Sequence, residues 1–394
     1  MKKILILNVG SSSCKFQIFT KELKLLGKGL IDRIGISGTS FFYKDINNKQ
    51  IKEKKDFEYK DFAEEFKRFI NDNNICKFEE FYLMVHRVVM GSEVFPENII
   101  VKDWKTIEKI EKLTPLAPLH QPYNVIALKE FFGKYKDTKH VVCFDTTFHS
   151  TIPEKNFIFT IPYQFYKDYK IRRYGAHGTS HQYITERLSN FLNKKNVTFI
   201  NLHLGNGASV CLIKDSKSYD TSMGLTPLGG LMMGTRSGDL DPSIVFYLIN
   251  QKKLDPNDVE NIFIKKSGLL GIYGKSSDMR DVISGEEKKE KRAILARELF
   301  IKRINDYIAT YLNEVEKVDA ITFTGGIGEN DLDLIKRVFK NFHLKKIKIK
   351  QDKFDRNLDI NLLSEKDSEI PIYIIKTNEE LQMAKIAKIL LKEL

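Results

Sequence analysis

Cysteine is scarce in this chain of 394 residues, and its four cysteines lie far apart, at Cys14, Cys76, Cys143 and Cys211. Their spacing lacks the close pairs that zinc knuckles and redox motifs require, and four are too few for a disulfide scaffold of this size. The sequence therefore predicts a protein of a reducing compartment, the cytoplasm.

Long apolar runs are missing as well. No stretch approaches the roughly 18 uninterrupted apolar residues of a membrane-spanning helix. Lys2 and Lys3 precede an apolar run at Ile4–Leu7, but this run is shorter than the about 7 to 15 residues of a signal-peptide core, and Asn8 ends it. We therefore expect a soluble, unprocessed chain without a membrane partner.

The charge is unbalanced, because 64 Lys and Arg residues face 52 Asp and Glu residues and leave a net charge of +12. Such an excess suits a nucleic acid, a membrane surface or an anionic small substrate. Acidic residues interrupt the lysine-rich segments at 44–60 and 286–292, whereas a nucleic-acid face usually interleaves arginine with aromatic residues. We interpret these segments as solvated faces and loops and expect no nucleic-acid partner.

Length and apolar content define the class of protein. Hydrophobic residues make up 42% of the chain, which is enough to fill the cores of two to three domains and excludes a disordered or fibrous protein. Two β-hairpins are expected, one at Lys3–Val9 with a turn at Gly10–Ser13, the other at Thr198–Leu204 and Ala208–Ile213. Gly10 and Gly205 are 205 − 10 = 195 positions apart, about half the chain, which indicates two copies of one α/β unit.

Strands alternate with helices in the rest of the chain, a pattern typical of sheets covered by helices. The periodicity predicts further strands at Phe81–Val89, His140–Asp145, Ala320–Thr324 and Ile370–Lys376. It predicts helices at Asp61–Asn71, Tyr123–Phe132, Ala293–Val315 and Leu381–Leu391.

Three small-residue turns, each placed after an apolar strand, suit phosphate. They are Gly10–Ser13, with Lys15 just beyond it, Gly205–Gly207, and the turn that starts at Gly325. Backbone N–H groups, hydroxyls and an ammonium group are the donors that phosphate needs, and glycine lets the backbone approach closely. None of the turns is a Walker A loop or a dinucleotide fingerprint. One such turn could be an ordinary hairpin, but three predict a nucleotide cleft.

Charged side chains near strand ends are the candidates for chemistry. Arg87 and Arg236 could together hold a planar carboxylate or phosphate, although structural ion pairing is an alternative for each. Asp145 and Glu379 follow strands, where ligands bind in α/β proteins, although Glu379 could instead complement a helix dipole. His177 and His181 have the spacing of a helical zinc pair, but the glutamate of H-E-x-x-H is absent and Gly178 weakens the helix. We favour an anion-binding role for His177.

Together these motifs resemble the acetate kinases, in family order and over essentially the whole chain. The motifs that carry the resemblance are NVGSSSCK at 8–15, HRVV at 86–89, APLHQPYN at 117–124, FDTTFH at 144–149, RRYGAHGTSH at 172–181, HLGNGAS at 203–209, TPLGGLMMGTRSGDLDP at 226–242, SSDMRD at 276–281, FTGGIGEN at 323–330 and TNEE at 377–380.

The resemblance implies an α/β class with a duplicated ribonuclease-H-like fold, shared with sugar kinases, actin and heat-shock chaperones, and a nucleotide cleft between two domains. Residues 1–150 would form an N-terminal domain, with the helix at 380–394 packing back on it, and residues 151–379 a nucleotide-binding domain. It also implies a cytoplasmic homodimer and the reversible, direct in-line transfer of the γ-phosphoryl group of ATP to acetate. The products are acetyl phosphate and ADP, and the metal is Mg²⁺, which Mn²⁺ could replace.

The resemblance also assigns roles to single residues. Asn8 and Glu379 match the metal positions, Arg87 the substrate arginine, Asp145 the residue usually named as proton donor or acceptor, and His177 and Arg236 the groups that stabilise the transition state. Val89, Leu119 and Pro227 match the acyl pocket. The ATP-binding positions are Lys15, His203, Leu204, Gly205, Asn206, Gly207, Asp278, Met279, Arg280, Gly325, Gly326, Ile327, Gly328 and Glu329.

Acetate is already ionised at neutral pH and needs no base, so we expect Asp145 to orient the arginines or the metal rather than to move a proton. Three departures from the family pattern lie near the acyl pocket: Met90-Gly91-Ser92 for His-Gly-Gly, Gln121 for Asn, and Gly229 for Glu. A propionate kinase is the nearest alternative. An actin-like or chaperone-like ATPase is a more distant one, because water as the nucleophile needs no arginine clamp.

Overall fold

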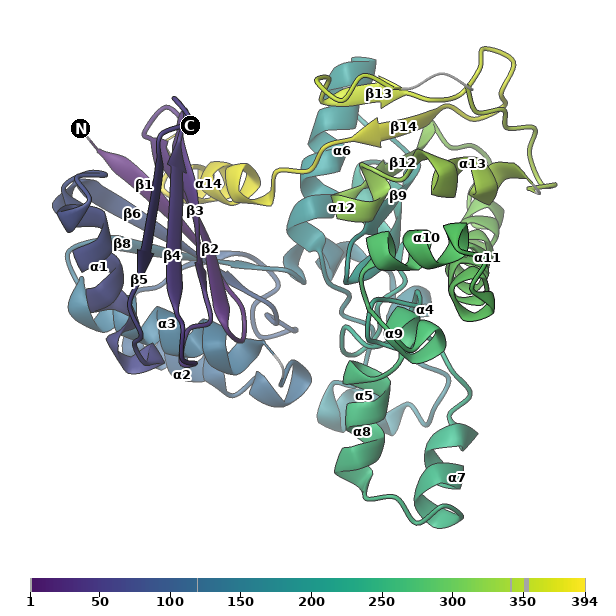
Figure 1. Ribbon diagram of the computed structural model, residues 1–394, viewed down its shortest axis with the longest axis horizontal. Helices are drawn as coiled ribbons and strands as arrows, with labels where there is room; N and C mark the ends of the chain where they lie inside the picture. Colours follow the sequence, from purple (N-terminus) through teal and green to yellow (C-terminus); the bar gives the residue numbers. More distant parts are fainter. Residues whose placement is uncertain (1, 119, 341, 351–353, 394) are drawn as a thin grey trace. The chain divides into compact units, whose positions relative to one another are not determined.

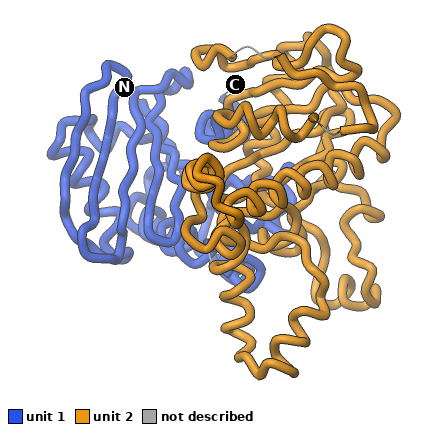
Figure 2. Tube along the Cα trace, turned by 45° about the vertical axis from the view of Figure 1, so that its right-hand side comes forward, with its two compact units in different colours: residues 1–150, 378–394 blue, residues 151–377 orange. Residues whose placement is uncertain are grey.

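The computed structural model describes residues 2–118, 120–340, 342–350 and 354–393. These residues form two compact units, residues 1–150 with 378–394 and residues 151–377 (Figures 1 and 2). Each unit contains one mixed β-sheet with helices packed on it. The α/β class predicted from the alternating pattern is confirmed.

The sheet of the first unit has eight strands in the order β5-β4-β3-β2-β1-β6-β8-β7. The strands β1 to β5 form an antiparallel meander, and β1, β6 and β8 run parallel. The bounds are β1 Lys3–Val9, β2 Ser13–Thr20, β3 Leu25–Asp32, β4 Ser40–Asp45, β5 Gln50–Lys54, β6 Phe81–Val88, β7 Ile99–Ile100 and β8 Lys139–Phe144.

The segment at 44–60, expected to be a solvated face or loop, contributes the end of β4 and all of β5. In β5 exposed residues alternate with half-buried ones, so Lys52 and Lys54 lie on the exposed side of this edge strand and Glu53 on the half-buried side. Charges on an edge strand hinder pairing with a further strand.

The pleat of β1 sends alternate side chains to two separate cores. Leu5, Leu7 and Val9 pack with α1 (Phe62–Asp72) and α3 (Gln121–Lys134), whereas Ile4 and Ile6 pack with α14 (Glu379–Leu390). The C-terminal helix α14 thus covers the second face of this sheet (Figure 1). One further α-helix of this unit is α2 at Trp104–Glu111.

The sheet of the second unit has six strands in the order β11-β10-β9-β12-β14-β13. Their bounds are β9 Phe199–Leu204, β10 Ala208–Lys214, β11 Lys217–Thr221, β12 Ala320–Thr324, β13 Ile360–Leu362 and β14 Ile372–Ile375. The helices are α4 Glu154–Phe157, α5 Gln164–Tyr169, α6 Gly178–Leu192, α7 Ser243–Asn250, α8 Pro256–Lys265, α9 Gly268–Tyr273, α10 Met279–Glu287, α11 Lys291–Asn313, α12 Gly325–Gly328 and α13 Leu332–Lys340.

The two sheets share a common order and direction of five strands. Three antiparallel strands are followed by two parallel ones in both, as β3-β2-β1-β6-β8 and as β11-β10-β9-β12-β14. The two hairpins at Gly10 and Gly205 occupy the same place in this order. The duplication predicted from their spacing is therefore confirmed in the strand order.

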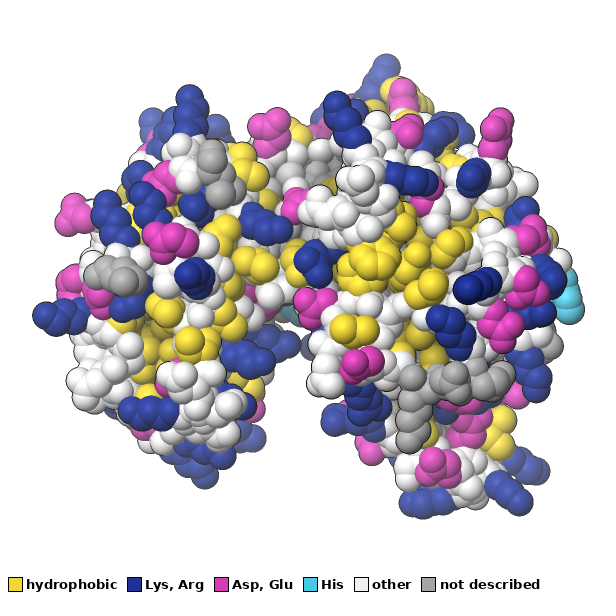
Figure 3. Space-filling model, turned by 90° about the horizontal axis from the view of Figure 1, so that it is seen from above, with side chains coloured by type: hydrophobic (Ala, Val, Ile, Leu, Met, Phe, Trp, Pro, Cys, Tyr) yellow, Lys and Arg dark blue, Asp and Glu magenta, His cyan; other side chains and the backbone are white. Residues whose placement is uncertain are grey.

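Charged side chains form no dominant patch of one sign on the face drawn in Figure 3. There the basic side chains spread over both units and alternate with acidic ones. Among the described residues, no helix is both long and apolar enough to cross a bilayer.

Candidate active site

Four predicted site residues lie on one face of the first sheet, the face that α14 covers. Asn8 alternates with Leu7 and Val9 and so shares the face of Ile4 and Ile6. Lys15 pairs with Asn8 across the β1–β2 hairpin, and cross-strand partners point to the same side. Arg87 alternates in the same way with buried residues of β6, and Asp145 directly follows β8. Because β1, β6 and β8 are parallel neighbours, their carboxyl ends bring these groups together.

Arg87 is the centre of this cluster. Its Nε and Nη2 donate to the carboxylate of Asp145, with Nε 2.9 Å from Oδ1, and its Nη1 donates to Asn8 Oδ1 at 2.9 Å. Burial alone would lower the pKa of Arg87, but Asp145, Glu379 and Glu380 outweigh it and raise that pKa. A guanidinium carries five N–H donors, and these contacts use three. One hydrogen on each terminal nitrogen is left for a ligand.

The first turn of α14 brings two carboxylates to the same face. Asn378 caps the helix, its Oδ1 accepting from the N–H of Leu381 at 3.0 Å. Glu380 accepts from Gln17 Nε2 at 3.2 Å, and burial with the neighbouring Glu379 raises its pKa against the pull of Lys15 and Arg87. Glu379 lies in the first turn of α14, where an acid complements the helix dipole, as the alternative interpretation expected. The charge of Glu379 also helps to raise the pKa of Arg87.

The loop after β6 is held by two amides of α3. Asn124 accepts from the N–H of Val89 at 3.1 Å and donates to the carbonyl of Val9 at 2.6 Å. Gln121 accepts from the N–H of Met90 and donates to its carbonyl. Gln121, one of the departures from the family pattern, therefore fixes another departure, the loop that starts at Met90. Val89 is buried beside these contacts, and Leu119 lies outside the described residues.

The second unit contains a cavity of about 810 Å³ that brings three predicted segments together. It is lined by residues of the three segments, namely Gly205 and Asn206, Asp278 to Arg280, and Gly326 with Ile327. The rest of the lining consists of Ser277, Ile283, Asn330, Asp331 and Arg356. A volume of this order suits a small organic ligand. Donors from three loops around one cavity are the arrangement expected for a nucleotide.

The segment after β12, expected to be a turn, begins the short helix α12. Gly325 takes φ +79°, and a Cβ atom there would lie 2.8 Å from the carbonyl oxygen of Leu204, so the position needs glycine. A Cβ atom on Gly326 would meet no atom within 4 Å, because this residue faces the cavity. Glu329 Oε1 accepts from the N–H groups of Gly325 and Thr377 and so links the segment after β12 to the segment after β14.

The segment at 278–280 begins α10. Asp278 caps this helix by accepting from the N–H of Arg280, and it also pairs with the Arg280 guanidinium. That guanidinium is 88% exposed at the cavity. Arg280 is therefore the most accessible cation among the predicted nucleotide residues of this segment.

His177, Gly207 and Arg236 lie next to one another. A Cβ atom on Gly207 would lie 3.4 Å from His177 Nε2 and 3.8 Å from Arg236 Nη1. His177 precedes α6 with a left-handed backbone, φ +58°, and its ring lies 4.3 Å, between centroids, from that of His203. Arg236 Nη1 donates to the carbonyl of Pro227 at 3.1 Å. The two predicted stabilisers of the transition state thus flank one glycine turn.

The zinc pair considered for His177 and His181 is not formed. His181 Nε2 and Nδ1 both bond to protein atoms, Ser209 Oγ at 2.9 Å and Asn201 Nδ2 at 2.8 Å. Within the part of the chain that the structure describes, no group of three or more His, Cys, Asp or Glu side chains could hold a metal ion.

The chain matches the model of the acetokinase family over residues 3–385. It is 43% identical to an acetate kinase of Mycoplasma genitalium, with 98% of this chain and 97% of that protein covered, and 40% identical to one of Finegoldia magna, with 97% and 98% covered. The chain belongs to the acetokinase family. This confirms the predicted family and the class of enzyme, a phosphotransferase.

Solved acetokinase structures have the same fold. A propionate kinase from Francisella tularensis superposes with a TM-score of 0.92 at 37% identity, with 98% of this chain and 99% of that chain covered. An acetate kinase from Porphyromonas gingivalis superposes with 0.89 at 32% identity, with 99% and 100% covered. The two-domain fold implied by the sequence motifs is thereby confirmed.

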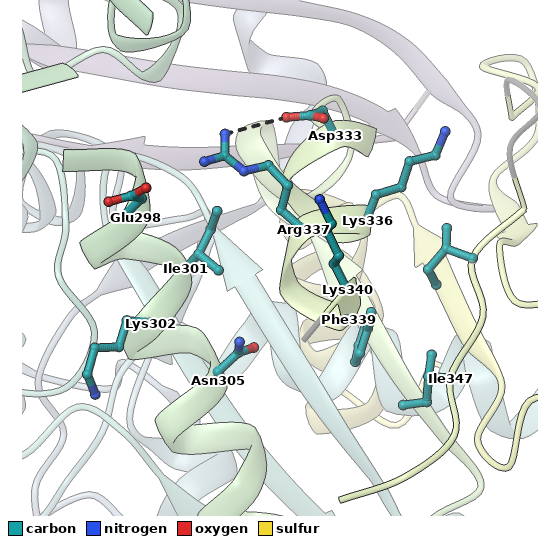
Figure 4. Close-up of a pocket in the computed structure, with 11 residues that line it drawn as sticks. Glu298, Ile301, Lys302, Asn305, Asp333, Lys336, Arg337, Phe339, Lys340 and Ile347 are labelled. Carbon is teal, nitrogen blue, oxygen red and sulfur yellow. Dashed lines mark ion pairs between the residues drawn. The ribbon is translucent and has the colours of Figure 1, made fainter. Parts of the chain in front are cut away.

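A second cavity, about 900 Å³ in volume, lies between α11 and α13 in the second unit (Figure 4). Its lining contains none of the predicted acetokinase residues. Lys302, Lys336, Arg337 and Lys340 stand there with Glu298 and Asp333, and Arg337 pairs with Asp333 at 3.8 Å. Its basic side chains are offset by acidic ones. Cavity size alone therefore does not distinguish this cavity from the one that the predicted glycine turns line.

Four residues beside the predicted site residues were not named singly as candidates, although Asn330 and Ser180 stand in motifs that carried the resemblance. Gln17 donates to Glu380. Asn330 and Arg356 line the cavity of about 810 Å³. Ser180 bonds to His203 Nδ1 at 2.8 Å. Arg356 comes from a stretch with no small-residue turn or strand end, so no local signal marks it.

Proposed function

We propose that this acetokinase transfers the γ-phosphoryl group of ATP to acetate, reversibly, to give acetyl phosphate and ADP. The observation that carries the proposal is the cavity at Gly205, Asp278 and Gly326, into which three loops of the second unit direct donors. The membership of the chain in the acetokinase family indicates the class of reaction, phosphoryl transfer. In the first unit, Arg87 and the residues bonded to it are proposed to bind the acid.

The nucleotide is bound by the residues of that cavity. Backbone N–H groups of the glycine turns and the exposed guanidinium of Arg280 suit phosphate oxygens. His177 and Arg236, on either side of Gly207, act on the charge that develops on the transferred group. In phosphoryl transfer such charge stabilisation and positioning supply most of the catalysis.

Acetate is bound through Arg87. Its two unused N–H donors, one on each terminal nitrogen, suit the two oxygens of a carboxylate. Asp145 and Asn8 lock the guanidinium in place. Since acetate is already ionised, Asp145 has no proton to remove, and we assign it the role of positioning Arg87. Val89, fixed by Asn124, contributes to the apolar end of the site.

Magnesium is proposed as the metal, with Asn8 and Glu379 as its protein ligands. An amide oxygen and a carboxylate are hard oxygen donors, and Mg²⁺ commonly takes one or two protein ligands and fills its octahedron with water and phosphate. When bound there, the ion would neutralise charge on the phosphate oxygens. Manganese accepts the same ligands and is the expected substitute.

Propionate is the competing acid, because one similar solved structure is that of a propionate kinase. Ala176, which precedes His177, has a small side chain. We expect propionate to be accepted less efficiently than acetate, since one methylene is worth about 1 to 3 kcal/mol of discrimination. The test measures kcat/KM for ATP consumption with acetate, propionate and butyrate. A higher value for propionate than for acetate would make the protein a propionate kinase.

A homodimer is proposed through the helix α7, whose sequence is SIVFYLIN. None of its residues is buried, and Ile244, Phe246 and Tyr247 are large and exposed. The helix stands at the end of the second unit remote from the sheet (Figure 1). An apolar helix left uncovered in one chain is typical of an interface, and we assign a second copy as its partner.

A cytoplasmic location is proposed from the cysteines. All four are free thiols, and Cys14, Cys143 and Cys211 are buried, where burial raises their pKa values and keeps them unreactive. Such thiols are compatible with a reducing compartment.

A further inference from the structure

A continuous chain of hydrogen bonds runs through the second unit to His177. Thr322 Oγ1 lies 2.6 Å from Asn201 Oδ1, and Asn201 Nδ2 lies 2.8 Å from His181 Nδ1. His181 Nε2 and His177 Nδ1 each lie 2.9 Å from Ser209 Oγ. Thr322, Asn201, His181 and Ser209 are fully buried.

The chemistry of the groups favours one direction along this chain of bonds. The amide nitrogen of Asn201 only donates, so His181 Nδ1 accepts and its proton is on Nε2. His181 therefore donates to Ser209. If His177 Nδ1 also donated to Ser209, the buried Ser209 hydroxyl would have no acceptor in this chain of bonds, so we direct its one proton to His177 Nδ1. His177 Nδ1 accepts, and the imidazole proton is on Nε2.

The opposite direction requires the Asn201 amide to be rotated, with its nitrogen facing Thr322. A separation of 2.6 Å is short for N–H···O, which prefers about 2.9 to 3.0 Å, and normal for O–H···O. The rotated amide would also leave the Thr322 hydroxyl with the Ile200 carbonyl as its acceptor, at 3.5 Å. The strand register places Thr322 directly opposite Asn201 in the β9–β12 ladder, so this first bond is set by the sheet.

We infer that Thr322, Asn201, His181 and Ser209 are positioning residues that hold His177 as a neutral imidazole with its proton on Nε2. That nitrogen lies 3.4 Å from the place of a Cβ atom on Gly207, and Arg236 Nη1 lies 3.8 Å from the same place. The inference deepens the proposed function, on which the role of His177 rests. His177 then donates a hydrogen bond to the transferred phosphoryl group, and Arg236 provides the positive charge beside it.

The direct test is the tautomer itself, measured on the full-length wild-type protein labelled with ¹⁵N-histidine. Two-bond ¹H–¹⁵N correlations at neutral pH report which ring nitrogen carries the proton, and a His177→Gln spectrum identifies the His177 signals among those of the eight histidines. We expect protonated Nε2 and bare Nδ1 at both His177 and His181. A proton on Nδ1 of His177, alone or together with one on Nε2, would overturn the inference. Acetate-dependent turnover of the same sample tests the proposed function separately.

Variants test the link to catalysis. Ser209→Ala interrupts the chain, and we expect kcat to fall about 10- to 100-fold, as for other residues that orient a reactive histidine, with KM for ATP changed less than about threefold. His177 should then populate both tautomers. Ser209→Cys, which restores a weak donor and acceptor, should recover part of kcat.

Thr221→Val is the matched control, because Thr221 is another buried strand threonine of this sheet and its hydroxyl donates to a backbone carbonyl, that of Val210, at 3.3 Å. It should leave kcat and the His177 signals unchanged. An unchanged kcat in Ser209→Ala, or a loss of the same size in Thr221→Val, would refute the positioning role.

Discussion

Removing the charge of Asp145 should cost no further activity once Arg87 is removed, because Asp145 is proposed to act only through Arg87. Arg87→Ala removes a group that binds the acid throughout the reaction and should lower kcat/KM for acetate about 100- to 1000-fold, the usual cost of one charge-stabilising donor. Asp145→Asn keeps one acceptor but loosens the guanidinium and should cost about 10- to 100-fold. Independent effects would multiply in the double variant to about 1,000- to 100,000-fold.

For the free energy of unfolding, the second substitution should partly reverse the effect of the first. Asp145 is 1% exposed, so Arg87→Ala leaves a buried carboxylate without its partner, at a cost of about 3 to 5 kcal/mol. Asp145→Asn in that background removes the charge and should recover most of this loss. The double variant is then more stable than Arg87→Ala and no less active.

The assay is a double-mutant cycle, with kcat/KM for acetate and the urea-unfolding free energy measured on the wild type, both single variants and the double variant. Arg68→Ala is the control, since Arg68 is 26% exposed against 23% for Arg87 and also pairs with a carboxylate, that of Glu53. It should keep full activity. Multiplicative losses in the double variant would refute the positioning role of Asp145 and restore it as an independent catalytic group.

Three further outcomes are expected. Gly326→Ala adds a methyl group that meets no protein atom but points into the nucleotide cavity, so KM for ATP should rise several-fold with little change in melting temperature, whereas Gly133→Ala, where the new Cβ only touches Trp104 at 3.4 Å, should leave KM unchanged. Phe246→Lys with Tyr247→Lys should convert a dimer to a monomer in light scattering without loss of soluble protein, and a dimer that persists would exclude α7 as the interface. Burial lowers the pKa of His140 to about 4 and that of its partner His86 well below 6.5, so the unfolded chain binds more protons below pH 6.5. Unfolding free energy should therefore fall on acidification from pH 6.5 toward 4, by up to about 1.4 kcal/mol per pH unit for each histidine, and a flat profile would contradict the buried neutral pair.

The fold could be predicted where periodicity is strong. β1 and β12 have the bounds that the apolar runs indicated, and the two glycine hairpins disclosed the duplication. The segment at 44–60 was harder, because a strand at a sheet edge can carry charges on both faces and so has no apolar alternation. The turn at Gly325 proved helical because Glu329 holds its N–H group and Leu204 crowds the backbone, and both contacts are set by the tertiary structure.

The sequence indicated which residues belong to the candidate site, but it did not indicate the hydrogen bonds between them. Strand ends and family motifs indicated Asn8, Arg87 and Asp145, while their shared hydrogen bonds depend on the parallel order of β1, β6 and β8. The link from Thr322 to His177 joins residues 145 positions apart, from 322 − 177 = 145. No local pattern reports such a contact.

The most direct test of the central claim is ³¹P NMR of a mixture of the purified protein, Mg²⁺, ATP and acetate. The account predicts that acetyl phosphate and ADP appear in equal amounts, that neither forms without acetate, and that acetyl phosphate with ADP regenerates ATP. Inorganic phosphate and ADP formed at the same rate with and without acetate would contradict it and identify the protein as an ATPase.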